Sequence, residues 1–479
     1  MLGVMLLLLA GSAAGAEPAG DAGGMDYGFM TYFRHHPPKE RMVSRNPYPF
    51  AGPAIGPGQD IPVCPAARTE AAYATPDARD MRHIFQGKDG WLFRTSDFRT
   101  DFSATPAALR YFDRLNRRLA AAGQTLVVAF QPPRALLAFQ HVDASAMPKD
   151  YAPEKARKGF QDFLKQLRSA GIAAVDLSAP PAGVSYFVKG DTHWSPEGAM
   201  WAADMVAKEA KKIPAYAALP RQKFTTSVAG VAAPSRGAFE EFIQQTCGIN
   251  IQMTAAPVWT TTAVSPKPKS APSPGIVLLG TGDSANDRKF GFAGALKASL
   301  ERDVYNAAVT GGGAGVSPYT YFASDEYRRH PPKIVIWEIP SNYNYNNPAA
   351  YAAFRQTLSA IEGGCGDKAA LASWSGDIDG NEMNVFSGME KIPLQNAYLY
   401  LEARGSSTAS LRTEILYGDG EADEIDMAGS PGASESRRYY LDMNRATAAP
   451  AQFLHIVSDR PGGSLVARLC RSHTHVADR

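Results

Sequence analysis

The chain has 479 residues, which is more than one typical hydrophobic core needs and favours two domains. With 45% hydrophobic and 20% charged residues it is typical of globular proteins and not of disordered ones. The net charge of +2 gives no sign of a nucleic-acid-binding protein, so no nucleic acid is expected as a partner.

The chain begins with an apolar run, residues 1–16, that ends in the small-residue pattern Ala14-Gly15-Ala16. The run is too short to span a membrane and predicts a secretory signal peptide. It has no basic residues at its start, so the true start of the signal stays open, and a membrane anchor or a buried helix is the alternative. Residues 17–65 are rich in Pro and Gly and predict an extended arm without helix or strand.

Four cysteines, Cys64, Cys247, Cys365 and Cys470, are spread along the chain. None lies in a CxxC pair, which argues against a zinc or thioredoxin-like site. An even number in an exported chain indicates two disulfides, for which three pairings exist. The pairing Cys64–Cys247 with Cys365–Cys470 is preferred because it places one bridge in each half, and four free buried thiols are the alternative.

Strands and helices are expected to alternate from residue 87 to residue 339. A tight turn and an aromatic strand come first, at 87–93. The other predicted strands are apolar runs at 126–130, 172–177, 276–280, 304–309 and 334–339. The predicted helices lie at 105–123, 153–170, 196–212, 287–300 and 318–329. This order predicts an α/β fold with a parallel sheet covered on both faces, and a site where the strands end.

Two other stretches differ from this alternation. Residues 253–275 are rich in Pro, Ser, Thr and Ala without an apolar period, and they predict a surface excursion. After Cys365 short alternating strands are expected at 385–386, 398–401, 411–417, 439–443, 453–457 and 465–469. These predict a C-terminal β-sandwich. The predicted organisation is a signal peptide at 1–16, a catalytic domain at 17–364 and the β-sandwich at 365–479.

An acid and a histidine two residues apart form the first candidate site, in the segment Gly190–Glu197. Ser195 is a good N-cap for the helix that follows, so Asp191 and His193 are expected in a turn that faces a cleft. The carboxylate can hold one imidazole nitrogen while the other takes a proton from a nucleophile. The alternative is a metal site with Glu197, but a second histidine at helical spacing is missing, so neither a metal nor a cofactor is expected.

The candidate nucleophile is Ser284, in the turn Gly282-Asp283-Ser284 between an apolar strand and a helix. An ordinary N-cap is the alternative. Further candidates for oxyanion or substrate contacts leave the ends of predicted strands: Gly312, Asn286, Tyr343, Tyr345 and Arg134. The glycine-rich loop at 311–315 lacks the Gly-Lys-Ser/Thr ending of a phosphate-binding loop.

The segments Gly87–Phe93, Gly190–Gly198, Leu278–Asn286 and Trp337–Pro340 together resemble the periplasmic alginate O-acetyltransferases of the AlgX/AlgJ type. The resemblance covers most of the chain after the signal, including the C-terminal domain and its cysteines, and is closer to the AlgX branch. It implies an SGNH-hydrolase-like catalytic domain followed by a carbohydrate-binding β-sandwich.

That resemblance also implies roles for the site residues: Ser284 is the acyl-accepting nucleophile, His193 the general base and Asp191 its orienter. Both cysteine pairs would be disulfides, in the pairing given above. The implied enzyme is a periplasmic acyltransferase that acetylates an exopolysaccharide during its biosynthesis and export. At the nucleophile turn, however, Gly282-Asp283 departs from the family's pattern.

The partners implied are an anionic, alginate-like exopolysaccharide, a membrane O-acetyltransferase that relays the acetyl group, and other proteins of a polymer-export complex. The segment from Cys365 onward holds more acidic than basic residues, which a polyanion would disfavour unless arginines form a local patch. The candidates are Arg404, Arg412, Arg437, Arg438 and Arg445. Two other functions stay open: a polysaccharide acetylesterase, and a non-catalytic polysaccharide-binding scaffold.

Overall fold

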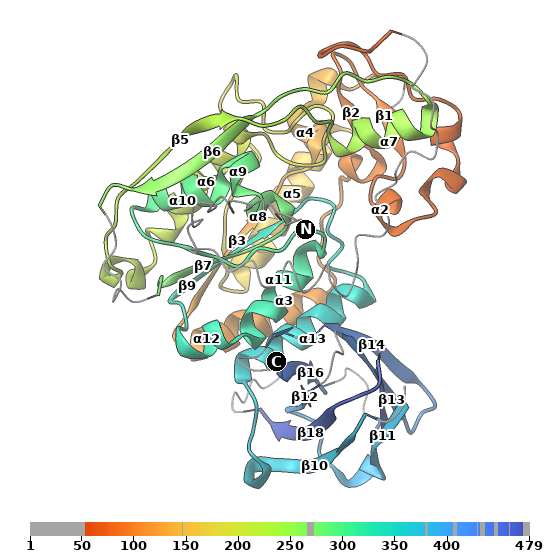
Figure 1. Ribbon diagram of the computed structural model, residues 1–479, viewed down its shortest axis with the longest axis vertical. Helices are drawn as coiled ribbons and strands as arrows, with labels where there is room; N and C mark the ends of the chain where they lie inside the picture. Colours follow the sequence, from red (N-terminus) through yellow and green to blue (C-terminus); the bar gives the residue numbers. More distant parts are fainter. Residues whose placement is uncertain are drawn as a thin grey trace, which may run out of the picture.

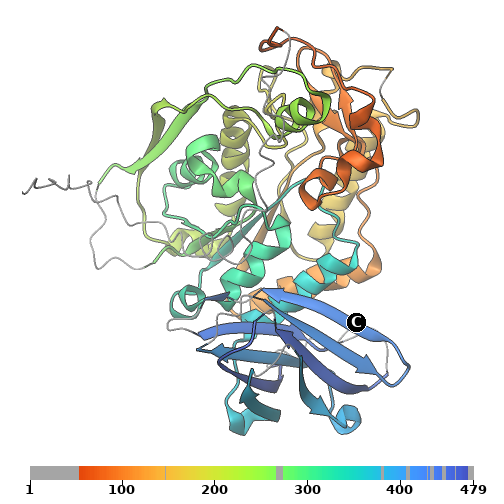
Figure 2. The ribbon, with the colours of Figure 1, turned by 45° about the vertical axis from the view of Figure 1, so that its right-hand side comes forward.

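The computed structural model describes residues 53–472 except 146, 266–272, 379–381, 406–409, 429, 432–435, 445–448 and 459. The predicted signal peptide and most of the predicted arm lie outside the described residues. Figures 1 and 2 show an α/β body with a β-sandwich at one end, as the sequence predicts. Within the described part of the chain, no helix is both long and apolar enough to cross a lipid bilayer.

The centre of the α/β body is a five-stranded parallel sheet in the order β4-β3-β9-β7-β8. Its strands are β3 (Thr125–Phe130), β4 (Ala173–Ala174), β7 (Ile276–Leu279), β8 (Tyr305–Asn306) and β9 (Ile334–Ile339). Every residue of β7 and β9 is buried, which explains why β7 is a continuous apolar run in the sequence and β9 is apolar except for Glu338.

Helices cover both faces of this sheet, and the alternation of side chains along each strand assigns residues to the two faces. Val127 and Ala129 of β3 face one helical layer, whereas Val128 and Phe130 face the other. The first layer holds α6 (Pro196–Ala210) and α10 (Phe292–Leu300). The second layer holds α3 (Pro106–Ala121), α5 (Pro153–Ser169), α11 (Gly313–Ala323), α12 (Asp325–Arg329) and α13 (Pro348–Glu362).

The predicted nucleophile turn after β7 forms a short helix, α8 (Gly282–Ala285). The single helix predicted at 287–300 consists of two pieces, α9 (Asp287–Phe290) and α10. Gly291, between the last two, has a φ of 77°, a left-handed conformation that ends α9. The short pieces allow the chain to turn several side chains towards the strand ends.

The surface excursion predicted at 253–275 is partly wrong, because it contains β6 (Pro257–Ala263). This strand pairs antiparallel with β5 (Phe224–Val231) in a two-stranded ribbon on the outside of the body (Figure 1). Most of the ribbon's side chains are at least partly exposed, so it has no continuous apolar run. Its β-branched threonines and valines favour a strand, and this signal is weaker than an apolar period.

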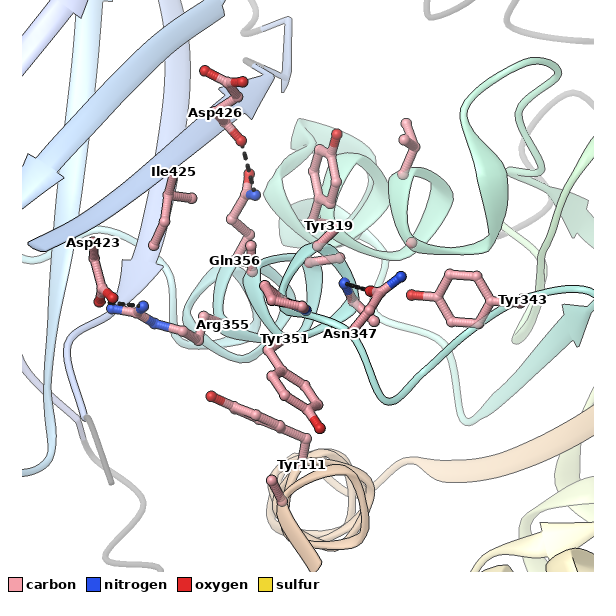
Figure 3. A pocket seen from close by; sticks show the side chains of 18 of the residues that line it. Tyr111, Tyr319, Tyr343, Asn347, Tyr351, Arg355, Gln356, Asp423, Ile425 and Asp426 are labelled. Atoms are coloured by element: carbon pink, nitrogen blue, oxygen red, sulfur yellow. Dashed lines mark hydrogen bonds and ion pairs between the residues drawn. The ribbon is translucent and has the colours of Figure 1, made fainter. Parts of the chain in front are cut away.

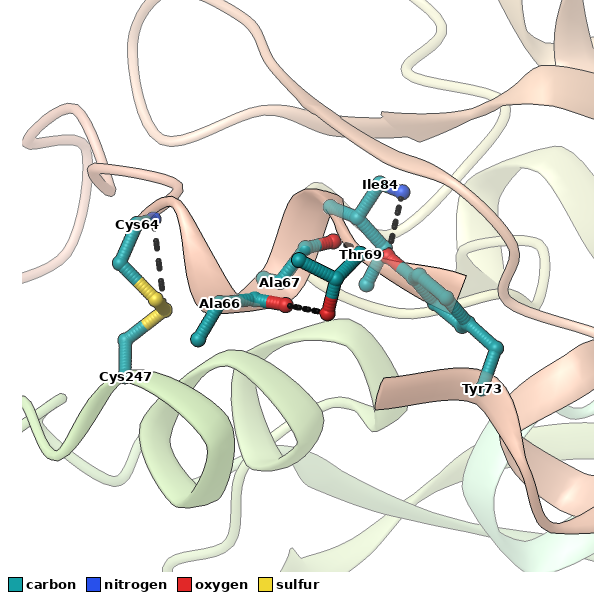
Figure 4. Close-up of a disulfide and its surroundings, with 7 residues drawn as sticks. All are labelled: Cys64, Ala66, Ala67, Thr69, Tyr73, Ile84 and Cys247. Atoms are coloured by element: carbon teal, nitrogen blue, oxygen red, sulfur yellow. Dashed lines mark hydrogen bonds between the residues drawn. A yellow bond between two sulfur atoms is a disulfide. The ribbon is translucent and has the colours of Figure 1, made fainter. Parts of the chain in front are cut away.

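Most of the remaining elements of the body surround the amino-terminal part, whereas residues 214–218 lie beside the end of α10, where Tyr216 donates to the carbonyl of Leu300. They are η1 (Ala66–Arg68), η2 (Glu70–Tyr73), α2 (Pro76–Arg79), β1 (Ile84–Gln86), β2 (Leu92–Arg94), η3 (Thr95–Phe98), α4 (Arg134–Leu137), η4 (Phe139–His141), η5 (Pro214–Ala218) and α7 (Ala238–Cys247). β1 and β2 form the hairpin that contains the predicted turn at 87–91. Figure 4 shows η1 beside the end of α7, where Cys64 and Cys247 are bonded.

Both predicted disulfides are present. The Cys64–Cys247 bond joins segments 183 residues apart, and the Cys365–Cys470 bond joins segments 105 residues apart. There is no free cysteine in the described part of the chain, which holds all four. Paired cysteines are typical of proteins that fold outside the reducing cytosol.

The C-terminal domain is built from two antiparallel sheets with the orders β10-β18-β12-β16-β15 and β11-β17-β13-β14. Its elements are η6 (Asp367–Ala369), β10 (Ala370–Asp377), β11 (Glu382–Ser387), η7 (Met389–Lys391), β12 (Ala397–Arg404), β13 (Ser410–Tyr417), β14 (Ala422–Ala428), β15 (Ser430–Pro431), β16 (Ser436–Asp442), β17 (Ala451–Ser458) and β18 (Ser464–Arg471). The sequence missed β10 and β14, whose polar side chains give little alternation. A mainly apolar core, in which the buried hydroxyl of Thr413 donates to the sulfur of Met427, fills the space between the sheets.

Strand β12 shows how the two domains meet. Leu399 and Leu401 point into the sandwich core, whereas Tyr398 and Tyr400 belong to the core beneath α13. This strand is therefore buried on both faces, unlike most strands of an antiparallel sheet. Figure 1 shows α13 and α3 lying between the parallel sheet and the sandwich, so the two domains share a packed boundary.

Candidate active site

The turn that carries the acid and the histidine is closed by backbone pairing on both sides. Phe187 pairs with Trp194 in an isolated antiparallel bridge, and the N–H of Val188 donates to the carbonyl of His193 at 3.2 Å. Ser195 then caps α6 by accepting the N–H of Gly198 at 2.9 Å, as predicted. His193 thus lies between backbone segments that hydrogen bonds hold in place on both sides.

Asp191 and His193 form the expected pair, because Nδ1 of the imidazole lies 2.7 Å from Oδ1 of the carboxylate. The N–H of Thr192 donates to the same oxygen at 2.7 Å, and Nζ of Lys289 donates to Oδ2 at 3.0 Å. The Asp191 side chain is 4% exposed and that of His193 27% exposed. The ring of Phe290 stacks on the imidazole at a centroid distance of 5.0 Å. This leaves Nε2 as the nitrogen that faces a reacting group.

The charges around this pair shift both pKa values. Burial by itself lowers the pKa of His193, but the hydrogen bond to Asp191 and the negative charges of Asp283 and Asp191 outweigh it, so the pKa is raised. Burial by itself raises the pKa of Asp191, but the hydrogen bond and charge of His193 and the Lys289 ammonium lower it well below its usual range. Asp191 is therefore a carboxylate at neutral pH, and His193 is a stronger base than a free histidine.

Trp194 joins this turn to the predicted nucleophile turn 89 residues further along the chain. Its backbone N–H donates to Oδ1 of Asp283 at 3.1 Å, and its indole Nε1–H donates to the carbonyl of Asp283 at 3.1 Å. The indole is completely buried. The two distant turns are thus held together, as the sequence analysis requires of an active site.

The predicted nucleophile does not complete the triad. The Ser284 side chain is fully buried, and its hydroxyl donates to Oε2 of Glu338 at 3.1 Å. No hydrogen bond between Ser284 and His193 is found among the described residues. Residues two apart on a helical turn point in different directions, and α8 directs Ser284 towards the interior of the sheet. This hydroxyl lies beneath the turn and away from the partly exposed imidazole.

Gly282 is the residue of the turn that faces the histidine. A Cβ atom at this position would lie 3.2 Å from Nε2 of His193, 3.4 Å from Nδ2 of Asn286 and 3.6 Å from the methyl group of Thr310. A hydroxyl one bond further out would be within hydrogen-bonding reach of Nε2. The side of the turn that faces the base therefore carries no side chain.

Two buried carboxylates were not predicted as site residues: Asp283, which belongs to the turn, and Glu338 of β9, which lies beneath it. Nε2 of Gln131 donates to both, at 3.0 Å to Asp283 and 2.8 Å to Glu338. Burial and the neighbouring Asp283 charge raise the pKa of Glu338 to about 7, and burial raises the pKa of Asp283. A charged residue within the apolar strand Ile334–Ile339 was the available sequence signal. These groups support the turn from below.

Of the remaining candidates, Asn286 contacts this turn, whereas Gly312 and Tyr343 lie in the segments that follow β8 and β9. Asn286 donates from Nδ2 to the carbonyl of Gly282 at 2.8 Å. Gly312, which is two residues after Thr310 in the chain, lines the large cavity between the two domains, and so does Tyr343. All three stay candidates for substrate contact.

Arg134 and Tyr345 were expected to contact substrate, and their burial contradicts this. Arg134 is 2% exposed and donates to the carbonyls of Leu92, Val188 and Lys189, so it holds the segment that leads to Asp191. Burial lowers its pKa to about 10. The Tyr345 side chain is fully buried, and its hydroxyl donates to the carbonyl of Phe102. Both are structural residues.

A cavity of about 790 Å³ lies between the α/β body and the sandwich (Figure 3). Four tyrosines line it, and Tyr111 and Tyr351 stack on each other with ring centroids 5.3 Å apart. On the sandwich side it is bordered by β14, where Asp423 pairs with Arg355 at 2.7 Å. The cavity therefore combines aromatic rings with polar groups and connects the loop at Gly312 to the C-terminal domain.

The arginines proposed as a polyanion patch are largely engaged in ion pairs. Arg404 pairs with Glu402 at 2.9 Å, Arg412 with Asp426 at 2.8 Å, and Arg438 with Asp325 at 2.6 Å. Arg437 also has interactions, and Arg445 lies outside the described residues. As for metal ions, the described part of the chain contains no group of three or more His, Cys, Asp or Glu side chains that could hold one.

Comparison with known proteins adds sequence and structural relatives. Residues 84–341 match the family described as SGNH hydrolase-like domain, acetyltransferase AlgX. The chain is 28% identical to the alginate biosynthesis protein AlgX of Pseudomonas aeruginosa, over 86% of this chain and 89% of that one. It is 32% identical to the probable alginate O-acetylase AlgJ of the same organism, over 54% of this chain and 69% of that one.

A solved structure of Pseudomonas aeruginosa AlgX is similar in fold as well. It superposes with a TM-score of 0.74 at 27% identity and covers 86% of this chain and all of the other. The similarity thus extends over both the α/β body and the β-sandwich.

Proposed function

Because the chain belongs to the family of AlgX acetyltransferases with an SGNH hydrolase-like domain, we propose that it transfers acetyl groups to an alginate-like exopolysaccharide. The observation that carries this proposal is the Asp191–His193 hydrogen bond of 2.7 Å, with Nε2 facing the turn after β7. Such a pair can remove a proton from a hydroxyl group while the reaction takes place next to it.

His193 acts as the general base and Asp191 as its orienting partner. Asp191 fixes the tautomer by holding Nδ1–H, and its negative charge stabilises the imidazolium that forms when Nε2 takes a proton. The raised pKa of His193 increases its strength as a base. Among backbone donors, the buried N–H of Gly282 has no hydrogen bond to a described residue and belongs to the residue next to Nε2, so it is the candidate donor to the developing oxyanion.

The cavity between the two domains is proposed to hold the polymer (Figure 3). Tyrosines present an apolar ring and a polar hydroxyl, which suits the faces and hydroxyl groups of sugars. Gly312 lines the cavity, and Thr310, two residues earlier in the chain, borders the space beside Gly282. A polymer that leaves the cavity along this loop is proposed to reach that space. The β-sandwich would then act as a carbohydrate-binding module.

Two disulfides support a periplasmic location, where such bonds persist. In that compartment the acetyl donor would be supplied by a membrane O-acetyltransferase, and other proteins of a polymer-export complex would be neighbours. The relatives named for alginate biosynthesis support this setting.

The test compares His193→Ala with His141→Ala in acetyl transfer from an activated acetyl ester to mannuronate oligosaccharides. His141 is a matched control, since its Nδ1 lies 2.9 Å from Asp89 and its ring stacks on Trp91, far along the chain from the site. We expect His193→Ala to lower transfer roughly 10²-fold or more and His141→Ala to leave it unchanged. Equal activity of the two variants would refute the proposal.

A non-catalytic polysaccharide-binding role is the second candidate, favoured by the engagement of Ser284 with Glu338 instead of His193. It predicts oligosaccharide binding that His193→Ala does not change and no acetyl transfer by the unmodified protein. An esterase would instead release free acetate from acetylated oligosaccharide. Measuring both acetate and acetylated product in one assay separates these three functions.

A further inference from the structure

We infer that Gly282 occupies the place beside His193 where a protein nucleophile would stand, and that the acceptor hydroxyl of the polysaccharide fills this space. The acetyl group would then pass directly from donor to polymer without an acyl-enzyme intermediate. This inference rests on the proposed function and specifies its mechanism.

The geometry of Gly282 gives the first argument. The three atoms nearest to the added Cβ would be the ends of the His193 and Asn286 side chains and the Thr310 methyl group, at 3.2–3.6 Å, and all three belong to side chains. The φ of Gly282 lies outside the left-handed region, so the backbone there accepts any residue. Neither conformation nor close backbone packing requires glycine, and its effect is to leave space next to the base.

The placement of Ser284 gives the second argument. A Cβ atom at Gly280 would lie 2.9 Å from the Ser284 hydroxyl and 2.6 Å from Oε2 of Glu338, so this hydroxyl points back towards the end of β7. Glu338 also accepts the N–H and the hydroxyl of Thr281, at 2.8 Å and 3.0 Å. The Ser284 hydroxyl thus belongs to a buried structural network beneath the turn.

The step balances without a protein nucleophile. Nε2 of His193 takes the proton of the acceptor hydroxyl while that oxygen forms a bond to the carbonyl carbon of an acetyl ester. The tetrahedral intermediate then breaks the bond to the donor oxygen, which takes the same proton from Nε2 and leaves as an alcohol. The products are the acetylated polymer and the deacetylated donor.

The first test is the variant Gly282→Ser, which places a hydroxyl within reach of Nε2. After exposure to an activated acetyl ester, we expect about one acetyl group per molecule on the introduced serine, because a serine with an adjacent base forms a covalent intermediate. The double variant Gly282→Ser/His193→Ala should carry none there. Intact-mass measurement and peptide mapping give the readout, and thermal unfolding of each variant checks its fold.

The unmodified protein should form no acetyl-enzyme, and its initial-rate patterns should be those of a ternary complex instead of a ping-pong reaction. Gly282→Ala fills the space without adding a hydroxyl and should lower transfer roughly tenfold or more. Ser284→Ala should keep its transfer activity. Acetyl found on Ser284 of the unmodified protein, or full transfer by a folded Gly282→Ala, would overturn the inference.

These outcomes are distinct from a failure of the proposed function. An unmodified protein that transfers acetyl in a His193-dependent manner but carries acetyl on Ser284 keeps the function and refutes the inference. An unmodified protein without any transfer refutes the proposed function, and with it direct transfer. In that case, acetylation of the introduced serine in Gly282→Ser would still show that a hydroxyl at this position reacts with an acetyl ester next to His193.

Discussion

At the scale of single residues, the Asp191 carboxylate is shared by two partners. Oδ1 holds the imidazole of His193, and Oδ2 holds the ammonium group of Lys289 at 3.0 Å. The positive charge of Lys289 lowers the pKa of His193, although less than the carboxylates raise it. The lysine therefore adjusts the strength of the base without touching it.

We expect Lys289→Met to raise the pKa of His193 further. The base form of histidine exists above its pKa, so kcat/KM should rise with pH, with a midpoint above the ordinary value near 6.5. In Lys289→Met this rise should move to higher pH, and the displacement should be modest because the ammonium is partly exposed. The measurement is a pH–rate profile of acetyl transfer.

Lys297→Met is the matched control for this profile. Lys297 pairs with Asp303 at 3.1 Å and, like Lys289, lies against an aromatic ring, but it is on α10 away from the imidazole. An equal displacement of both profiles would show that the charge of the whole protein, and not the pair at Asp191, sets the pKa.

The residues of the site differed in how predictable they were. Asp191 and His193 could be found because their spacing and the cap that follows form a local pattern. The direction of Ser284 could not be found, because it depends on which side of a single turn faces a segment 91 residues away. Gly282 carries no side chain, and the only sign of it in the sequence was a departure from the family's pattern. Glu338 offered a signal that was not used, a charge within an apolar strand.

At the scale of elements, α7 connects the amino-terminal segment to the site. Its first N–H groups, of Phe239 and Glu240, donate to the carbonyl of Gly190 at 3.1 and 3.2 Å. Its last residue, Cys247, is bonded to Cys64 (Figure 4). The helix thus holds the residue before Asp191 at one end and a covalent bond at the other.

Removing this bond in the double variant Cys64→Ser/Cys247→Ser should lower the free energy of unfolding by about 2–5 kcal/mol, since a long loop then gains freedom in the unfolded chain. Urea unfolding followed by far-UV circular dichroism gives the value. The double variant avoids a lone reactive thiol. An unchanged unfolding midpoint would mean that packing around Ile61 and Phe242 suffices to hold this segment.

Among elements, the buried strands of the parallel sheet and the long amphipathic helices followed from apolar period alone. β6 did not, because its threonines and its tryptophan lie on a ribbon that is exposed in part. α9 and α10 were predicted as one helix, since the glycine that separates them is also compatible with a continuous helix at the level of pattern, and α8 was predicted as a turn. Tertiary contacts decided these cases.

At the scale of the whole molecule, a buried carboxylate lies where the two domains meet. Asp442, at the end of β16, accepts from Arg114 of α3 at 2.7 Å and from Arg118 at 3.2 Å. Its backbone carbonyl accepts from Arg355 of α13 at 2.8 Å. Three arginines of the body thus converge on one residue of the sandwich.

Asp442→Asn should therefore destabilise the protein by about 3–5 kcal/mol, because it leaves the buried Arg114 without its counter-charge and Arg118 with Glu362 alone, at 3.5 Å. Urea unfolding of the variant is the measurement. Asp162→Asn is the control: Asp162 also accepts from two cations, Lys158 and Lys165, but the group is solvent-exposed, so little change is expected. Similar effects of the two substitutions would show that the domain boundary does not depend on this charge.

The bond between Cys365 and Cys470 closes a ring around nearly the entire sandwich. A protease that severs one loop inside this ring produces two pieces that remain tethered, so the molecule keeps its mass on a non-reducing gel. Such damage becomes visible only after reduction. Wherever proteases are present, a nicked molecule would thus still keep both halves of its C-terminal domain together.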